Sequence, residues 1–241
     1  MDEQTTLFAL GIGAVSVGVV HTLMGPDHYL PFVALSKCRK WSLAKTVLIT
    51  FFCGLAHTLS SVLIGCVGMF IGVSTGVLEK IEGGRGDLVK WILLAFALAY
   101  VIYGLKRGLT WNKVHRHADG TVHSHGGGAS AHSHGLFGHS HSRDVSNDAN
   151  FWIIFLIFAF GPCEALIPMV VEPASRGDWW GVLFISVVFS AATIATMLVM
   201  VCSLLLGISG FKISGEFFPR WGSSITGLVI CSCAALMFWG L

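Results

Sequence analysis

Three histidines and one aspartate stand in stretches that are otherwise apolar, and these are the side chains best able to do chemistry. His21, Asp27 and His28 belong to the segment HTLMGPDH, and His57 belongs to FFCGLAHT. An ionisable group in an apolar span is costly, and it usually faces the interior of a helix bundle. Imidazoles with carboxylates are typical ligands of nickel, cobalt, zinc and iron(II), whereas calcium and magnesium prefer oxygen. The residue types therefore predict a site for a divalent transition-metal cation.

The spacing of the first group favours a shared site. His21 and His28 are seven residues apart, which places them on nearly the same face of an unbroken helix, and Asp27 is offset from that face by about 100°. Gly25 and Pro26 interrupt the helix between them. A proline removes a backbone donor and displaces a carbonyl, and unpaired backbone at membrane depth is tolerated where it lines a cavity. We interpret the break as part of a binding site, and a simple kink is the alternative.

A second Gly-Pro break extends the candidate site. Gly161-Pro162-Cys163-Glu164 aligns with Gly25-Pro26-Asp27-His28 at an offset of 136 residues. This alignment adds Cys163 and Glu164 to the candidate ligands, although a lone cysteine is more often a small buried hydrophobe. Neither broken segment contains Lys or Arg, which argues against an anion carrier, although helix N-termini alone can hold anions.

The composition predicts whether the chain is surrounded by water or by lipid. Of its 241 residues 54% are hydrophobic and 12% are charged, and the mean hydropathy is +0.74. Soluble domains carry about a quarter charged residues, and about 20 apolar residues cross a bilayer. We therefore expect an integral membrane protein. A net charge of +2 without a basic stripe excludes nucleic acid as a partner. With no phosphate-binding glycine loop and no nucleophile elbow, the chain is not expected to be an enzyme or to hold a cofactor.

The apolar spans predict an all-α, polytopic membrane protein with six transmembrane helices. They lie near 7–36, 46–72, 90–109, 151–172, 180–206 and 221–241. Residues 1–109 and 151–241 would form two three-helix repeats of inverted orientation, each beginning with a broken helix. Eleven Lys and Arg residues fall on one side of this arrangement and four on the other. The positive-inside rule then places both termini outside and the loop 110–150 in the cytoplasm.

That loop holds most of the histidines. Eight of the 11 lie in it, many as His-x-His pairs among Gly and Ser: His115, His117, His123, His125, His132, His134, His139 and His141. Such a composition cannot build a packed core, so we expect a disordered segment. Its imidazoles predict capture or delivery of metal ions, with a plain hydrophilic linker as the alternative.

The motifs resemble those of the nickel/cobalt permease superfamily, which includes urease- and hydrogenase-accessory membrane proteins and exporters with histidine-rich loops. That family carries a His-x4-Asp-His signature on an early helix, written here as His21-x5-Asp27-His28, one residue longer. Residues 51–58 resemble the family's next motif, with His57 on its histidine. The resemblance implies transport of a divalent cation, in a bacterial inner or plasma membrane, with these four residues contacting the ion.

Two related architectures and one other class of protein remain as alternatives. A thiol-electron carrier needs a cysteine in both broken helices, and Asp27 stands where the partner of Cys163 would be. A sulfur-oxyanion exporter stays open. So does a membrane metal sensor or metallochaperone that passes ions from the loop to a partner protein without translocation.

The predicted function is therefore a carrier in which a cation exchanges water for His21, Asp27, His28 and His57, with Cys163 and Glu164 completing the site. Nickel or cobalt is expected, and zinc and iron(II) are compatible with the same ligands. Imidazoles must be neutral to bind a metal, so binding should weaken below about pH 6.

Overall fold

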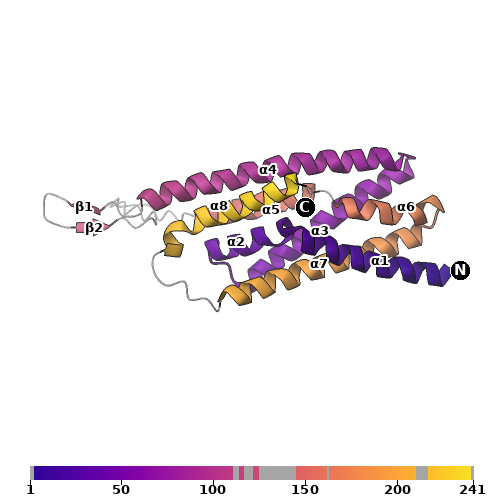
Figure 1. Ribbon diagram of the computed structural model, residues 1–241, viewed down its shortest axis with the longest axis horizontal. Coiled ribbons are helices and arrows are strands. Elements are labelled where there is room, and N and C mark those ends of the chain that lie inside the picture. Colours follow the sequence, from indigo (N-terminus) through magenta and orange to yellow (C-terminus); the bar gives the residue numbers. More distant parts are fainter. Residues whose placement is uncertain are drawn as a thin grey trace, which may run out of the picture.

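The computed structural model describes residues 3–110, 114–116, 122–124, 145–161, 163–209 and 217–239. These residues form an elongated helical bundle (Figure 1). Its helices are α1 (Glu3–Met24), α2 (Leu30–Arg39), α3 (Leu43–Phe70), α4 (Thr75–Thr110), α5 (Val145–Phe160), α6 (Ile167–Ser175), α7 (Trp179–Ser209) and α8 (Phe217–Phe238). Two short 3-10 turns, η1 (Pro26–His28) and η2 (Glu164–Leu166), lie between α1 and α2 and between α5 and α6.

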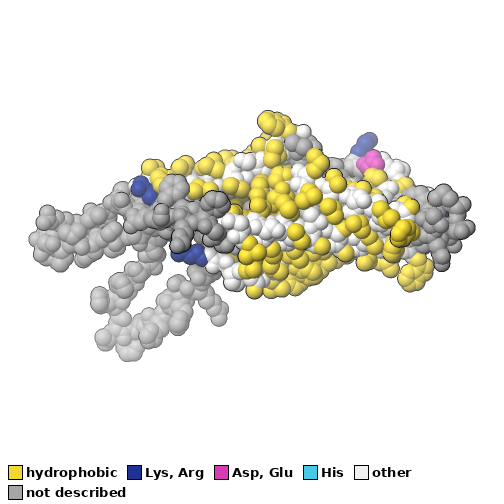
Figure 2. All heavy atoms as spheres, turned by 60° about the horizontal axis from the view of Figure 1, so that its bottom comes forward, with side chains coloured by type: hydrophobic (Ala, Val, Ile, Leu, Met, Phe, Trp, Pro, Cys, Tyr) yellow, Lys and Arg dark blue, Asp and Glu magenta, His cyan; other side chains and the backbone are white. Residues whose placement is uncertain are grey.

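Several helices are long and apolar enough to cross a membrane. Four meet this condition singly: Leu43–Phe70, Thr75–Leu109, Trp179–Ile208 and Arg220–Phe238. The bent pair formed by Phe8–Met24 and Pro26–Arg39 would make a fifth, and Phe151–Phe160 is apolar but shorter. One face of the bundle carries a broad field of hydrophobic side chains (Figure 2). These features fit an integral membrane protein with four to five spans, and the sixth span stays a prediction.

Both predicted helix breaks are present. Helix α1 ends at Met24, directly before Gly25, and the chain turns by 85° into α2. Helix α5 ends at Phe160, directly before Gly161. Gly25 is required by its neighbours, because a Cβ there would lie 2.5 Å from Nδ1 of His28. The element bounds also follow the predicted offset, since α5 ends 136 residues after α1 and α7 begins 136 residues after α3.

Helix α4 corrects the predicted third span, which was expected to begin near residue 90. It begins at Thr75 and includes a charged, glycine-containing stretch that has the composition of a loop. The stretch can be helical because two of its polar side chains, Glu82 and Arg85, have partners inside the bundle. Glu82 is fully buried and bonded to Ser61 of α3. Lys80, Arg85 and Lys90, three of the four positive charges on the less basic side of the predicted arrangement, therefore lie on a helix.

The loop 110–150 also differs in part from the expectation of disorder. Strands β1 (Val114–Arg116) and β2 (Val122–Ser124) pair antiparallel, with His115 opposite His123, and α5 already begins at Val145. Residues 111–113, 117–121 and 125–144 lie outside the described part of the chain, and the prediction for them is untested.

The helices of the two halves pack on each other. Helix α1 runs along α7, α3 packs against α5 and α7, and α4 lies along α8 (Figure 1). Small residues permit the closest of these approaches. A Cβ on Gly104 would lie 2.2 Å from the backbone nitrogen of Ser224, and one on Gly227 would lie 2.6 Å from that of Val101. Helices α4 and α8 therefore meet backbone to backbone.

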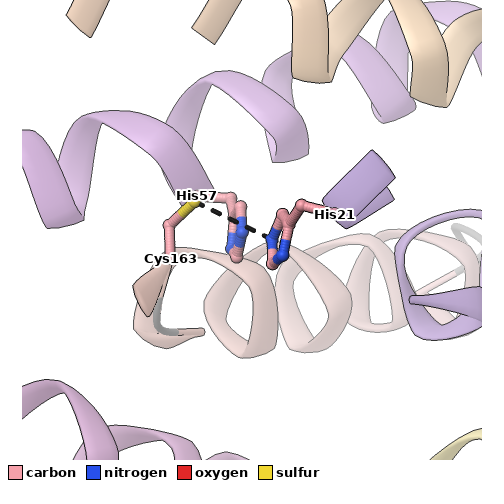
Figure 3. Close-up of side chains that lie close together, drawn as sticks. All are labelled: His21, His57 and Cys163. Atoms are coloured by element: carbon pink, nitrogen blue, oxygen red, sulfur yellow. Dashed lines mark hydrogen bonds between the residues drawn. The ribbon is translucent and has the colours of Figure 1, made fainter. Parts of the chain in front are cut away.

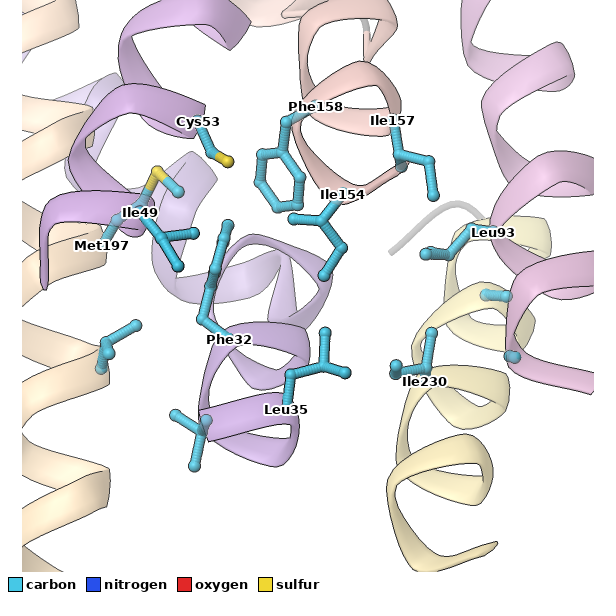
Figure 4. Packing of buried hydrophobic residues seen from close by; sticks show 14 of the residues in the cluster. Phe32, Leu35, Ile49, Cys53, Leu93, Ile154, Ile157, Phe158, Met197 and Ile230 are labelled. Carbon is cyan, nitrogen blue, oxygen red and sulfur yellow. The ribbon is translucent and has the colours of Figure 1, made fainter. Parts of the chain in front are cut away.

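The buried apolar residues form two clusters. The larger one includes Phe32, Ile49 and Phe158, and it joins parts of α2, α3, α4, α5, α7 and α8 (Figure 4). The smaller one is built around Phe189 on α7, with residues of α1, the second break and α6. The candidate histidines lie between these clusters, because the ring of His57 is 6.1 Å from that of Phe158 and the ring of His21 is 6.3 Å from that of Phe189.

Candidate metal site

Three of the predicted ligands converge from three separate elements. His21 comes from the last turn of α1, His57 from the middle of α3 and Cys163 from the second break. One ligand atom of each lies within 4.8 Å of the other two, and Sγ of Cys163 is 3.9 Å from Nε2 of His21 (Figure 3). A tetrahedral ion with ordinary metal–nitrogen and metal–sulfur bonds places these two atom types roughly 3.6 Å apart. The cluster therefore has the dimensions of a metal site.

His28 brings a third imidazole to the same place. Its ring centroid is 4.8 Å from that of His21 and 5.1 Å from that of His57, edge-on in both cases. The predicted proximity of His21 and His28 is thus confirmed, although it arises from the bend and not from a continuous helix face.

The neighbours of His28 determine which nitrogen can bind a metal. Nδ1 lies 3.1 Å from the carbonyl oxygen of Gly25 and 3.3 Å from Oδ1 of Asp27. Both are acceptors, so we place the ring proton on Nδ1, which leaves the lone pair on Nε2. That atom is buried, and no group in the described chain bonds to it. The same is true of Nε2 of His57.

Two unpaired imidazole nitrogens in one cluster are informative. Buried polar groups almost always have a hydrogen-bond partner, and leaving one without costs about 1–3 kcal/mol. A cation held by His57 would supply the missing interaction there, and the ring of His28 would have to shift toward the group of His21, His57 and Cys163 to share the same ion.

Asp27 takes a supporting position. Its carboxylate lies on the Nδ1 side of His28, away from the free Nε2. A carboxylate that accepts from the far nitrogen of a ligating histidine fixes the ring and raises its basicity. The structure therefore favours an indirect role for Asp27, in place of the direct contact expected. The side chain of Glu164 lies outside the described part of the chain, so its membership of the site stays a prediction.

The cluster borders an open cavity of about 470 Å³. His21, Asp27, His28 and His57 all line it, as do Val89, Lys90 and Leu93 of α4, among others. Lys90 was unexpected here, and its ammonium group is paired with Asp87 at 3.1 Å. Neither broken segment contains Lys or Arg, as predicted from the sequence, and the cation in the cavity wall comes from α4.

A polar group behind the second break was also missed. Ser61, Glu82 and Arg85 connect α3 and α4 to the backbone around Cys163. The available signal was the i, i+3 spacing of Glu82 and Arg85, which is typical of an ion pair on a helix. It was overlooked because the stretch was assigned to a loop.

Comparisons with protein-family models, with curated proteins and with solved structures found no match to this chain.

Proposed function

We propose that this protein is a membrane carrier of divalent transition-metal cations, with nickel or cobalt as the expected substrate. The observation that carries the proposal is the convergence of His21, His57 and Cys163 within 4.8 Å, beside an open cavity of about 470 Å³. The ring of His28 lies edge-on beside this group of three, and its Nε2 has no hydrogen-bond partner in the described chain. Three imidazoles with one thiolate suit borderline cations and are a poor match for calcium or magnesium.

The residues have distinct roles in the proposed binding step. His21, His57 and Cys163 replace water molecules of the incoming ion, and His28 approaches it through Nε2. Asp27 and the carbonyl of Gly25 hold the His28 proton on the opposite nitrogen, so the ring presents a lone pair. Gly161 keeps the space next to His57 free, because a Cβ there would lie 3.1 Å from Nδ1 of that ring.

The arrangement of the helices supports transport over static binding. The pairing of α1 with α7 and of α5 with α3 is the exchange expected if the two halves are inverted repeats. His57 lies halfway along α3, which fits a site near the middle of a bilayer. Because the two apolar clusters meet at the histidines, rocking of one against the other would open the site to alternate sides.

Metal binding and flux are the decisive measurements. We expect nickel to bind when it is titrated into the purified full chain. The affinity should be strongly reduced in the variant His21→Ala/His28→Ala, both with residues 117–144 present and with them deleted. Unchanged affinity in the loop-deleted pair would contradict the assignment of the site. Reconstituted vesicles then test transport: ion uptake without any partner protein means a carrier, and binding without uptake means a sensor or donor.

A second candidate is export of a sulfur oxyanion, and the position of Lys90 favours it. An ammonium group in the cavity wall is what a bare anion would need, although Asp87 neutralises it and Asp27 shares the cavity. Sulfite flux that survives His21→Ala/His28→Ala and is lost in Lys90→Ala would support the anion carrier. The reverse pattern, with nickel, supports the cation carrier.

A further inference from the structure

We propose that Arg85 and Glu82 of α4 are positioning residues, which hold the backbone of the second break so that the Cys163 thiol stays within reach of the metal. The proposal rests on the proposed function, because it assigns Cys163 as a ligand. It concerns residues that do not contact the cation themselves.

Arg85 fills the gap in hydrogen bonding that the break creates. A broken helix leaves backbone carbonyls without partners, which is costly at membrane depth. Nη2 of Arg85 donates to the carbonyls of Ala159 at 3.3 Å and Gly161 at 3.4 Å, and to Oγ of Ser60 at 2.9 Å. Its other terminal nitrogen pairs with Glu82. One guanidinium group thus joins α4, α3 and the end of α5.

Glu82 extends the connection to Cys163 itself. Its side chain has no exposed surface, and Oε2 accepts a hydrogen bond from Oγ of Ser61 at 3.0 Å. The same hydroxyl oxygen accepts from the backbone nitrogen of Cys163 at 2.9 Å. The residue that carries the thiol is therefore held by a chain of two hydrogen bonds to a buried carboxylate.

The held segment also contacts a second ligand. A Cβ on Gly161 would lie 3.1 Å from Nδ1 of His57, so the backbone at Gly161 packs directly against that imidazole. Metal ligation tolerates displacements of only about 0.5 Å. Loosening the break would therefore move Cys163 out of the cluster and leave His57 less constrained.

Stability alone does not account for this arrangement. A buried ion pair is weak evidence for stability, because its desolvation offsets its attraction, and apolar replacements are often neutral. The fork of Arg85 makes bonds in directions that a lysine could not match at the same time. The geometry points to orientation of the break.

Cobalt spectroscopy on the full chain tests the proposal. Removing both charges together, in Glu82→Gln/Arg85→Gln, avoids leaving a buried charge without a partner. We expect Co²⁺ on the parent protein to give a sulfur-to-metal charge-transfer band, and this band to be absent from the double variant. Co²⁺ affinity should fall about 10- to 100-fold, as for other residues that orient ligands. Arg85→Lys should also lack the band, whereas Glu79→Gln, which removes an exposed carboxylate on the same helix, should retain it.

The inference would be overturned if the double variant kept both the charge-transfer band and the Co²⁺ affinity of the parent protein. If the parent protein gives no such band, the assignment of Cys163 as a ligand fails instead, and thiol labelling then decides the positioning role. The labelling uses proteins that retain one cysteine each, either Cys163 or Cys53. Maleimide should label Cys163 about tenfold faster in the double variant than in the parent, since each charge-assisted hydrogen bond contributes at least that factor. Cys53, also fully buried, should keep its rate. An equal rise at both positions, or no rise at Cys163, refutes the positioning role.

Discussion

Replacing His57 by leucine separates a ligand from a structural histidine, because the two roles predict different effects on stability and on stabilisation by nickel. Nε2 of His57 is buried and makes no hydrogen bond within the described chain. The residue keeps only 4% of its surface exposed. An apolar side chain of similar size would remove an unsatisfied polar atom, at the cost of the hydrogen bond between the ring and the backbone of Phe158.

The expected magnitude follows from two opposing terms. Removing the unpaired nitrogen should gain about 1–3 kcal/mol. Imperfect packing of leucine against Phe158 and the neighbouring imidazoles, together with the lost hydrogen bond to the Phe158 backbone, should cost about 1–2 kcal/mol. The metal-free variant should therefore lie between about 1 kcal/mol less stable and about 2 kcal/mol more stable than the parent. For a chain of this length, each kcal/mol corresponds to a shift in melting temperature of roughly 2–4 °C.

Thermal unfolding of the detergent-solubilised protein, with and without nickel, is the assay. The parent should be stabilised by about 2.7 kcal/mol when nickel is present at 100 times its dissociation constant. The variant should lose most of that increment. Thr58→Val is the matched control, because Thr58 is equally buried but already donates to the carbonyl of Gly54 at 3.2 Å. It should bring no gain in stability and leave the nickel effect intact.

The reasoning is refuted if His57→Leu lowers the melting temperature of the metal-free protein by more than about 4 °C and keeps the nickel effect. That pair of results would mean that His57 supports the fold and does not bind the ion.

Three further substitutions and one control test other parts of the structure. Gly25→Ala puts a methyl group 2.5 Å from Nδ1 of His28, so the ring must move, and nickel affinity by calorimetry should fall with a stability loss of about 2 kcal/mol. Asp27→Asn keeps an acceptor for His28 but removes the charge, so nickel affinity should fall about 10- to 100-fold while the melting temperature is little changed. Gly227→Val places side-chain atoms against the backbone of α4, so it should destabilise the bundle by about 3 kcal/mol or prevent its assembly, as seen by size-exclusion chromatography. Gly207→Ala on α7, where a Cβ meets no atom within 4 Å, should be neutral or slightly stabilising.

The helix breaks and most of the cluster could be predicted from the sequence because their signals are local. A Gly-Pro pair interrupts a helix wherever it occurs, and a histidine in an apolar span needs a reason to be there. His21, His28 and His57 were found in this way. Cys163 was found only through its alignment with the first break.

The start of α4 and the role of Arg85 were not predictable by the same reasoning. The stretch before Lys90 is polar, and it is helical because Glu82 meets Ser61, which is 21 residues away in the chain. Likewise, the free nitrogen of His28 depends on the placement of Gly25 and Asp27 around the ring, which composition and spacing do not determine.

The packing of α1 on α7 and of α3 on α5 has a consequence for biosynthesis. Neither the first nor the second half can complete a core by itself, because each half supplies helices that the other needs. At typical rates of translation the remaining residues after α4 take on the order of ten seconds to be made. During that interval the buried polar side chains of α3, such as His57, lie next to lipid or the insertion machinery. A chain truncated before α7 should therefore be degraded. Two separately encoded halves should accumulate only when they are produced together.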